Sequence, residues 1–148
     1  MPPDPRPGAT PVKVCGLTTP EDAAAVAALG VWGIGVVLAA GSPRRLDPEA
    51  AARVAAAVPA GVARVGVFAG AGPGEIAEVA RAAALTHVQL HGGADPEEVR
   101  EATGLPVIEA VRVDGPAALA RARASAADLV LLDAAVPGRL GGTGTTFD

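Results

Sequence analysis

Two short runs of β-forming residues in this chain end in side chains that can transfer a proton. Cys15 ends the run that begins at Val12 and is followed by Gly16, and Asp133 follows the apolar residues 129–132. A reaction that takes a proton from one atom and gives a proton to another needs a base and an acid. In α/β barrel enzymes such groups lie at the C-terminal ends of strands. The thiol and the carboxylate are therefore the first candidates for catalysis.

Each of these two residues also has a structural interpretation. A lone cysteine is most often a small buried hydrophobe. Lys13 lies two residues before Cys15 on the same face of the strand, and a cationic neighbour favours the thiolate; Lys13 itself is equally compatible with the bottom of a barrel or with solvent. An aspartate at the end of a strand often caps the loop that follows. From the residue types alone, both interpretations stay open.

Three further polar residues follow predicted strands and are candidates for ligand binding. Arg44, in the loop Ser42-Pro43-Arg44, has a guanidinium that can hold a carboxylate by two parallel hydrogen bonds. Gln89 and His91 flank Leu90 at the end of another strand and can orient a ligand. A solvated loop arginine and a structural histidine are the alternatives for Arg44 and His91.

A glycine loop after Asp133 is a further candidate for ligand contact. Gly141, Gly142 and Gly144 can hold a phosphate or can belong to an ordinary loop, because neither a lysine nor a helix start accompanies them. No spacing of cysteine and histidine predicts a metal site. The sequence therefore predicts neither a metal nor another cofactor.

The elements that must position these residues alternate regularly along the chain. Short Val, Leu and Ile runs alternate with Ala-rich segments, which is typical of parallel strands joined by crossover helices. The apolar character of the runs predicts a sheet covered on both faces. The predicted strands span 12–15, 31–38, 62–68, 87–90, 107–111 and 129–133, and the predicted helices span 20–29, 47–58, 73–83, 96–103 and 116–125.

Six strand units in strict alternation leave two α/β architectures. One is an open doubly wound sheet, and the other is part of an eight-stranded barrel. No glycine fingerprint for a dinucleotide follows the first strand, which weakens the doubly wound option. The expected fold is an incomplete TIM (β/α)8 barrel with about six parallel strands and intervening helices.

The composition narrows the class of protein. The chain has 148 residues, of which 50% are hydrophobic, so one domain with a sizeable core is expected. A net charge of -4 and an aromatic content of 2% disfavour a nucleic-acid partner. The single cysteine indicates a reducing, cytoplasmic compartment, and no apolar run is long enough for a membrane span. The proline-rich residues 1–11 predict a flexible leader, followed by the barrel domain over 12–148.

The ordered set of motifs resembles the phosphoribosylanthranilate isomerase family of tryptophan biosynthesis. Single motifs in this set are weak, but their order from about residue 12 to the last residue is specific. The matching segments are Lys13-Val14-Cys15-Gly16-Leu17-Thr18, Ser42-Pro43-Arg44, Val65-Gly66-Val67-Phe68, Gln89-Leu90-His91-Gly92, and Leu132-Asp133 with Gly141-Gly142-Thr143-Gly144 and Phe147-Asp148.

The resemblance implies an Amadori rearrangement on a (β/α)8 barrel without a metal or nicotinamide. Its substrate is the small molecule N-(5'-phosphoribosyl)anthranilate, and its product is 1-(2-carboxyphenylamino)-1-deoxyribulose 5-phosphate. By this resemblance Asp133 is the general acid at the ribose ring oxygen, and Cys15 is the base that removes the C2 proton. Arg44 holds the anthranilate carboxylate, and Gln89 and His91 line the same pocket.

One departure from the family pattern affects these expectations. The family has eight strands, and the last two βα units, which carry loops that bind the phosphate in many barrels, have no counterpart in the six predicted strands. Six strands cannot close a barrel, so the edge strands are left unpaired. Such a chain is expected to associate with another copy or to need a fragment supplied in trans. The alternative is that the sequence is an incomplete record of a longer protein. A non-catalytic barrel fragment and another phosphosugar isomerase of the same fold are the alternative functions.

Overall fold

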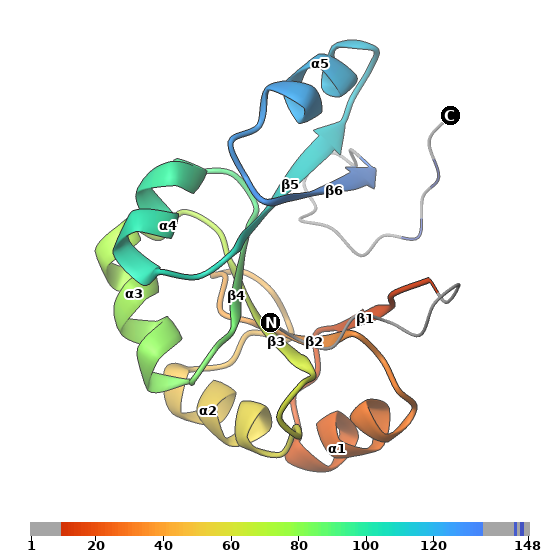
Figure 1. Cartoon of the computed structure of the whole chain (residues 1–148), viewed down its shortest axis with the longest axis vertical. Helices are drawn as coiled ribbons and strands as arrows, with labels where there is room; N and C mark the ends of the chain where they lie inside the picture. The colour runs from red at the N-terminus through yellow and green to blue at the C-terminus, as the bar shows by residue number, and fades with distance from the viewer. Residues whose placement is uncertain (1–9, 135–143, 145, 147–148) are drawn as a thin grey trace.

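The computed structural model describes residues 10–134, 144 and 146, and Figure 1 shows how its strands and helices alternate. Each strand except the last is followed by one helix, as the sequence predicts. The strands are β1 (Lys13–Cys15), β2 (Gly33–Val37), β3 (Ala63–Phe68), β4 (His87–Leu90), β5 (Val107–Val113) and β6 (Leu129–Ala134). The helices are α1 (Pro20–Ala28), α2 (Pro48–Ala56), α3 (Pro73–Ala82), α4 (Pro96–Thr103) and α5 (Ala117–Ala124).

The predicted leader falls almost wholly outside the described residues. Of residues 1–11, the structure describes Thr10 and Pro11, which are exposed and belong to no helix or strand. The expected barrel domain begins with β1 at Lys13, and Figure 1 marks where the chain is drawn as a grey trace.

The helix starts follow from local side-chain chemistry. Thr19, Asp47 and Asp95 precede α1, α2 and α4, and each accepts hydrogen bonds from backbone N–H groups of the first turn. A proline fills the first position of these helices, where a backbone N–H would have no partner in the helix. At the other end of α4, Gly104 adopts a φ of 68°, a left-handed conformation that suits glycine. These signals explain why the predicted and observed helix bounds agree closely.

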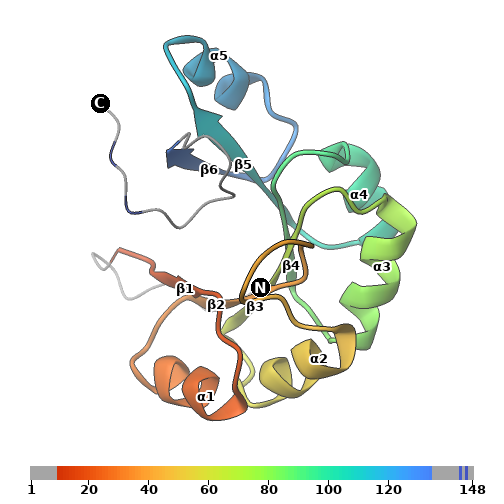
Figure 2. The ribbon, with the colours of Figure 1, turned by 180° about the vertical axis from the view of Figure 1, so that it is seen from behind.

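The six strands form one parallel sheet whose spatial order is the same as their order in the sequence, β1-β2-β3-β4-β5-β6. A doubly wound sheet would reverse direction at a switch point, so the sequential order favours the barrel architecture. Figures 1 and 2 show the sheet curving strongly, with the helices on its convex side and the edge strands β1 and β6 on either side of one opening. The sheet is therefore a curled half-barrel.

The curvature has a packing cause in the alternation of side-chain sizes. Ile34 and Val36 of β2 point outward and are fully buried in the large cluster between sheet and helices. Gly33 and Gly35 of the same strand point inward, and a Cβ on Gly33 would lie 2.8 Å from the Cβ of Ala63. Small residues inside and large residues outside allow the twisted strands to roll into a barrel wall.

The outer face of β6 differs from the expectation that every strand is covered on both faces. Val130 and Leu132 alternate with the inward-facing Leu131, and they remain 39% and 40% exposed. The reason is that α5 packs against β5, where Ala118 is fully buried, and does not cover β6 in the same way. The apolar pattern of a strand predicts that the strand can be buried, but the extent of its burial depends on which helices pack against it.

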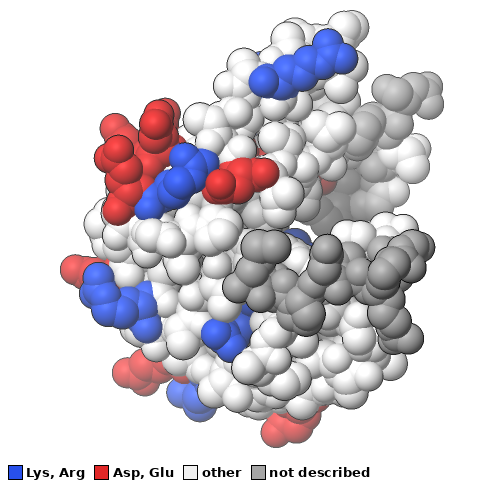
Figure 3. Space-filling view, in the orientation of Figure 1, with Lys and Arg blue, Asp and Glu red and all other residues white. Residues whose placement is uncertain are grey.

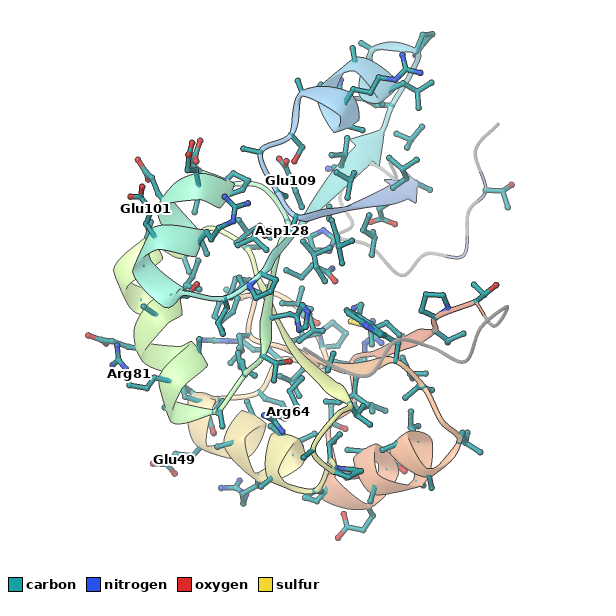
Figure 4. All side chains as sticks on the ribbon, in the orientation of Figure 1. Glu49, Arg64, Arg81, Glu101, Glu109 and Asp128 are labelled. Carbon is teal, nitrogen blue, oxygen red and sulfur yellow. The ribbon has the colours of Figure 1, made fainter. Side chains whose placement is uncertain are left out.

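The charged side chains lie mainly on the outer surface of the helices. Figure 4 shows Glu49 on α2, Arg81 on α3 and Glu101 on α4 directed away from the sheet, and Figure 3 shows an acidic patch over α4. No helix in the described part of the chain is long and apolar enough to cross a membrane. Figure 3 shows Lys and Arg side chains spread over this face among Asp and Glu.

An ion pair joins α4 to the start of β6. The Asp128 carboxylate accepts from the backbone N–H of Val107 at 2.8 Å and from Arg100 Nε at 3.1 Å. Arg100 also donates to the carbonyl oxygen of Ala126. The hydrogen bond from Val107 is the main reason that the pKa of Asp128 lies below its usual value of 3.8. Desolvation is the next largest effect and opposes it, and Arg100 lowers the pKa further. Asp128 therefore fixes where β6 begins.

We expect Asp128→Asn to lower the free energy of unfolding by about 1 kcal/mol, a value reduced from that of a buried charged pair because the Asp128 side chain is 42% exposed. Since the folded pKa lies below the unfolded one, the contribution is fully present above about pH 4 and is lost as the pH falls through the folded pKa. Urea unfolding at pH 7 and at pH 3 measures both effects. Glu101→Gln on the exposed face of α4 is the control, and an equal effect at both pH values would contradict this role of Asp128.

Candidate active site

A cavity of about 310 Å³ opens on the concave side of the sheet, toward the C-terminal ends of the strands. Five of the six strands or the loops that follow them contribute to it. The lining residues are Lys13, Cys15, Val37, Ala39, Ser42, Arg44, Val67, Ala69, Gln89, His91, Leu131 and Asp133. An apolar cavity with a few converging polar groups is the usual form of a small-molecule site.

The two predicted proton-transfer residues lie in this one cavity. Cys15 ends β1, Asp133 is the penultimate residue of β6, and both are partly buried. These strands are the two edges of the sheet, so only its curvature brings their inner faces to the same space. Cys15 is a free thiol that packs against the inner cluster of Val37, Ala39 and Val67. The arrangement gives the cavity one nucleophilic sulfur and one carboxylate.

Arg44 is tied to the same strand end as the thiol. Its Nη1 donates to the carbonyl oxygen of Cys15 at 3.1 Å, and its backbone N–H donates to Ser42 Oγ at 3.2 Å. The guanidinium therefore lies over the tip of β1 and keeps further N–H groups for a ligand. A carboxylate bound by Arg44 would lie close to Cys15, because one hydrogen bond joins the two residues.

Gly16 makes this contact sterically feasible. Its φ is +83°, and a Cβ at this position would lie 2.2 Å from Arg44 Nη1. The backbone N–H groups of Gly16 and Leu17 both donate to the carbonyl oxygen of Gly35, at 2.8 and 3.1 Å. The chain thus turns sharply after Cys15 and leaves the space that the guanidinium occupies.

Gln89 and His91 form a hydrogen-bonded pair at the end of β4. Gln89 Nε2 lies 3.1 Å from His91 Nε2, and the backbone N–H of His91 donates to the carbonyl oxygen of Phe68 at 2.9 Å. Burial lowers the pKa of His91, the Asp133 carboxylate opposes this effect, and the charge of Lys13 adds to it. The imidazole is therefore neutral near pH 7.

Two polar lining residues, Lys13 and Ser42, are not singled out as site residues by the sequence. The sequence leaves Lys13 between the bottom of the barrel and solvent, but it lines the cavity together with Cys15. The sequence does contain a signal for this placement, because Lys13 and Cys15 are two residues apart on a strand and therefore share a face. Ser42 stands in the sequence only as part of its loop, and its hydroxyl accepts from the backbone of Arg44. The position of Ser42 could not be predicted, because the residues of a loop follow no periodic pattern that shows which side chains face a cavity.

Glu109 is a polar residue of the predicted strand 107–111, but it does not line the cavity. It lies in the middle of β5, and its carboxylate accepts a hydrogen bond from the hydroxyl of Ser125 after α5. Adjacent residues in a strand point to opposite faces, so Glu109 faces the helix layer while Ile108 packs inside. The strand also continues to Val113, further than predicted.

The predicted glycine loop falls mostly outside the described residues. Gly141 and Gly142 are not among them, and Gly144 is described with a φ of 69°. A phosphate contact by these glycines stays a prediction. Among the residues that the structure describes, no group of three or more metal-ligating side chains is found.

Residues 12–148 match the family model for N-(5'-phosphoribosyl)anthranilate (PRA) isomerase. The enzyme of that name from Rubrobacter xylanophilus is 47% identical over 140 residues, which are 93% of this chain and 68% of the relative. The one from Myxococcus xanthus is 46% identical over 142 residues, covering 93% of this chain and 66% of the relative. The chain spans about two thirds of the length of these relatives.

Solved structures of phosphoribosyl anthranilate isomerases share the fold. The Thermotoga maritima structure superposes with a TM-score of 0.79 at 36% identity, covering 95% of this chain and 68% of that chain. The Thermus thermophilus structure gives 0.77 at 44% identity, covering 87% and 64%. A third, at 34% identity, has a TM-score of 0.73 with 86% and 66% coverage, and is a complex with reduced 1-(o-carboxyphenylamino)-1-deoxyribulose 5-phosphate. The prediction of a partial TIM barrel is confirmed.

We expect Gly16→Ala to displace the Arg44 guanidinium and to lower the free energy of unfolding by about 2 kcal/mol, since it adds a steric clash to the cost of a left-handed φ. Gly41→Ala is a matched control, because Gly41 has a φ of +82° and a methyl group there would meet nothing within 4 Å. Urea unfolding of both variants measures the difference. Equal destabilisation by the two substitutions would show that Arg44 does not depend on the space at Gly16.

Proposed function

Since the chain belongs to the N-(5'-phosphoribosyl)anthranilate isomerase family, we propose that its cavity catalyses the Amadori rearrangement of N-(5'-phosphoribosyl)anthranilate in tryptophan biosynthesis. The observation that carries the proposal is the convergence of Cys15, Asp133 and Arg44 on one cavity. These residues come from strands that are far apart in the sequence. Their convergence supplies a base, an acid and a carboxylate grip.

Asp133 acts first, as the general acid. It gives its proton to the ring oxygen of the ribose while the C1–O bond breaks, and the anthranilate nitrogen forms a double bond to C1. The nitrogen of the substrate is itself the electron sink, so this route assigns no step to a metal or nicotinamide. The position of Asp133 on the inner face of β6, beside the apolar Leu131, supports this role.

Cys15 acts second, as the base. Its thiolate takes the proton from C2, and the electron pair of that C–H bond neutralises the iminium to give an enolamine. The enolamine becomes the ketone when C1 gains a proton and the C2 hydroxyl loses one, so the reaction consumes no net proton. A positioned acid and base each contribute roughly 10²–10⁴ in rate.

Arg44 determines how the substrate is oriented. The bond from its Nη1 to the Cys15 carbonyl leaves other N–H groups for the anthranilate carboxylate. The aromatic ring then lies toward the apolar wall of Val37, Ala39 and Val67, which the inner cluster provides. Gln89 and His91 line the opposite part of the cavity, where the sugar would lie.

A second candidate function is binding of an aromatic acid without turnover. It is favoured by Arg44, whose guanidinium keeps N–H groups for a carboxylate beside the apolar wall of Val37, Ala39 and Val67. In this case the cavity would bind an anthranilate-like acid through Arg44, and Cys15 and Asp133 would have no measurable effect on a reaction.

The proposed activity also has consequences for location and partners. A soluble pathway enzyme with a small-molecule substrate would reside in the cytoplasm and would need neither nucleic acid nor membrane. The parallel edges of β1 and β6 favour pairing with another copy of the chain. Sedimentation at several concentrations would detect such association.

We expect this chain to convert N-(5'-phosphoribosyl)anthranilate, and Cys15→Ser and Asp133→Asn each to lower kcat by at least about 10²-fold. The loss of substrate fluorescence measures turnover, and circular dichroism confirms that the variants are folded. Asp114→Asn is the control, because Asp114 pairs with Arg121 of α5 and does not line the cavity. Absence of turnover by the unaltered chain would reject the isomerase proposal in favour of binding without turnover.

We expect Arg44→Lys to weaken binding of anthranilate by about 10-fold, because a lysine keeps the charge but loses the paired N–H geometry. Fluorescence titration of the ligand measures the dissociation constant. Arg45→Lys is the matched control, since Arg45 is the next residue and does not line the cavity. An equal effect of both substitutions would mean that charge alone, and not the Arg44 fork, holds the carboxylate.

A further inference from the structure

Gln89 is a buried polar side chain between two apolar neighbours in the sheet. All four residues of β4 are buried, and Gln89 is only 3% exposed. Its neighbours in the sheet are Val67 on β3 and Ile108 on β5, both of which are buried hydrophobic residues. A glutamine in this place needs a reason beyond packing.

The Gln89 amide is only half satisfied. Its Nε2 lies 3.1 Å from His91 Nε2, whereas its Oε1 is buried and has no hydrogen-bond partner among the described residues. An unpaired buried acceptor costs stability, and an apolar side chain of the same shape would remove that cost. Stability therefore does not explain the glutamine, but the bond to His91 does.

We infer that Gln89 is a positioning residue that holds His91 as the neutral tautomer protonated on Nδ1. The amide donates to His91 Nε2, so that nitrogen is an acceptor, and in a neutral imidazole the proton is then on the other nitrogen. The backbone bond from His91 to Phe68 holds the main chain beneath the ring at the same time. His91 then offers a directed hydrogen-bond donor from Nδ1 without adding positive charge.

The charged groups around His91 support a neutral His91 beside positively charged Arg44 and Lys13. Asp133 faces it from β6, Lys13 from β1 and Arg112 from β5, and Arg44 lines the same cavity. Burial has the largest effect and lowers the pKa of His91. Positive charge for a carboxylate is supplied by Arg44 and Lys13, so His91 serves the uncharged part of a ligand. The identity of that part as a sugar hydroxyl rests on the proposed function.

The inference is tested with Gln89→Met, which keeps the volume and removes the amide. We expect the melting temperature to stay within about 3 °C of the original or to rise. We expect the nitrogen chemical shifts of His91 to change from the Nδ1–H pattern to a mixture of tautomers. The chain has only two histidines, and His87, whose Nδ1 lies 2.9 Å from Thr86 Oγ1, is the internal reference.

Gln89→Glu is the second variant, since a carboxylate can only accept from Nε2 and should move the His91 proton to that nitrogen and raise its pKa. His91 shifts that are unchanged in both variants would overturn the inference, and so would a fall of more than about 3 °C in the melting temperature of Gln89→Met. The spectra are recorded on ligand-free protein, so failure of the isomerase proposal would leave this result unaffected. In the turnover assay, Gln89→Met should raise KM for N-(5'-phosphoribosyl)anthranilate at least about fivefold, because the His91 donor is no longer held in place.

Discussion

The site depends on the curvature of one parallel sheet. Cys15 and Asp133 lie on β1 and β6, which are the two edges of the sheet and are never neighbours in it. In a flat sheet of this strand order they would be separated by four intervening strands. Small inward residues such as Gly33 and Gly35, opposed by large outward ones such as Ile34, allow the sheet to roll until both edges face one cavity. The convergence of the two side chains on one cavity is thus a consequence of how side-chain volume is distributed across the wall.

The same small residues connect packing to the thiol proposed as the base. A Cβ on Gly35 would lie 2.7 Å from Cys15 Sγ, so the neighbouring strand leaves room for the sulfur on the inner face. Gly16 leaves room for Arg44 on the other side of Cys15 in the same way. The thiol and the guanidinium are therefore placed by the absence of side chains at two glycines. Their distance from each other is limited by the single bond from Arg44 to the Cys15 carbonyl.

Much of the fold could be predicted because its signals are local. Proline and Asp or Thr caps determine where α1, α2 and α4 begin, and the runs of β-branched residues determine the strands. The hydrogen bond from Arg44 to the Cys15 carbonyl could not be predicted, because it depends on a left-handed Gly16 and on two loops that pack together. The outward orientation of Glu109 and the exposure of Val130 depend on the register of β5 and on where α5 packs. Such features arise from tertiary contacts that no short window of sequence contains.

The acid of the proposed reaction lies on the strand with the least cover, and this makes its anchoring important. β6 has only β5 as a neighbour in the described sheet, through six residue pairs that include Arg112 with Asp133. Its start is held by Asp128, which bonds the backbone of Val107 and the side chain of Arg100. A surface ion pair of this kind adds little stability, but it sets the register that decides whether Asp133 faces the cavity or the helix layer. A shift by one residue would turn Leu132 inward and remove the carboxylate from the site, so the bonds of Asp128 at the start of β6 bear directly on where the proposed acid lies.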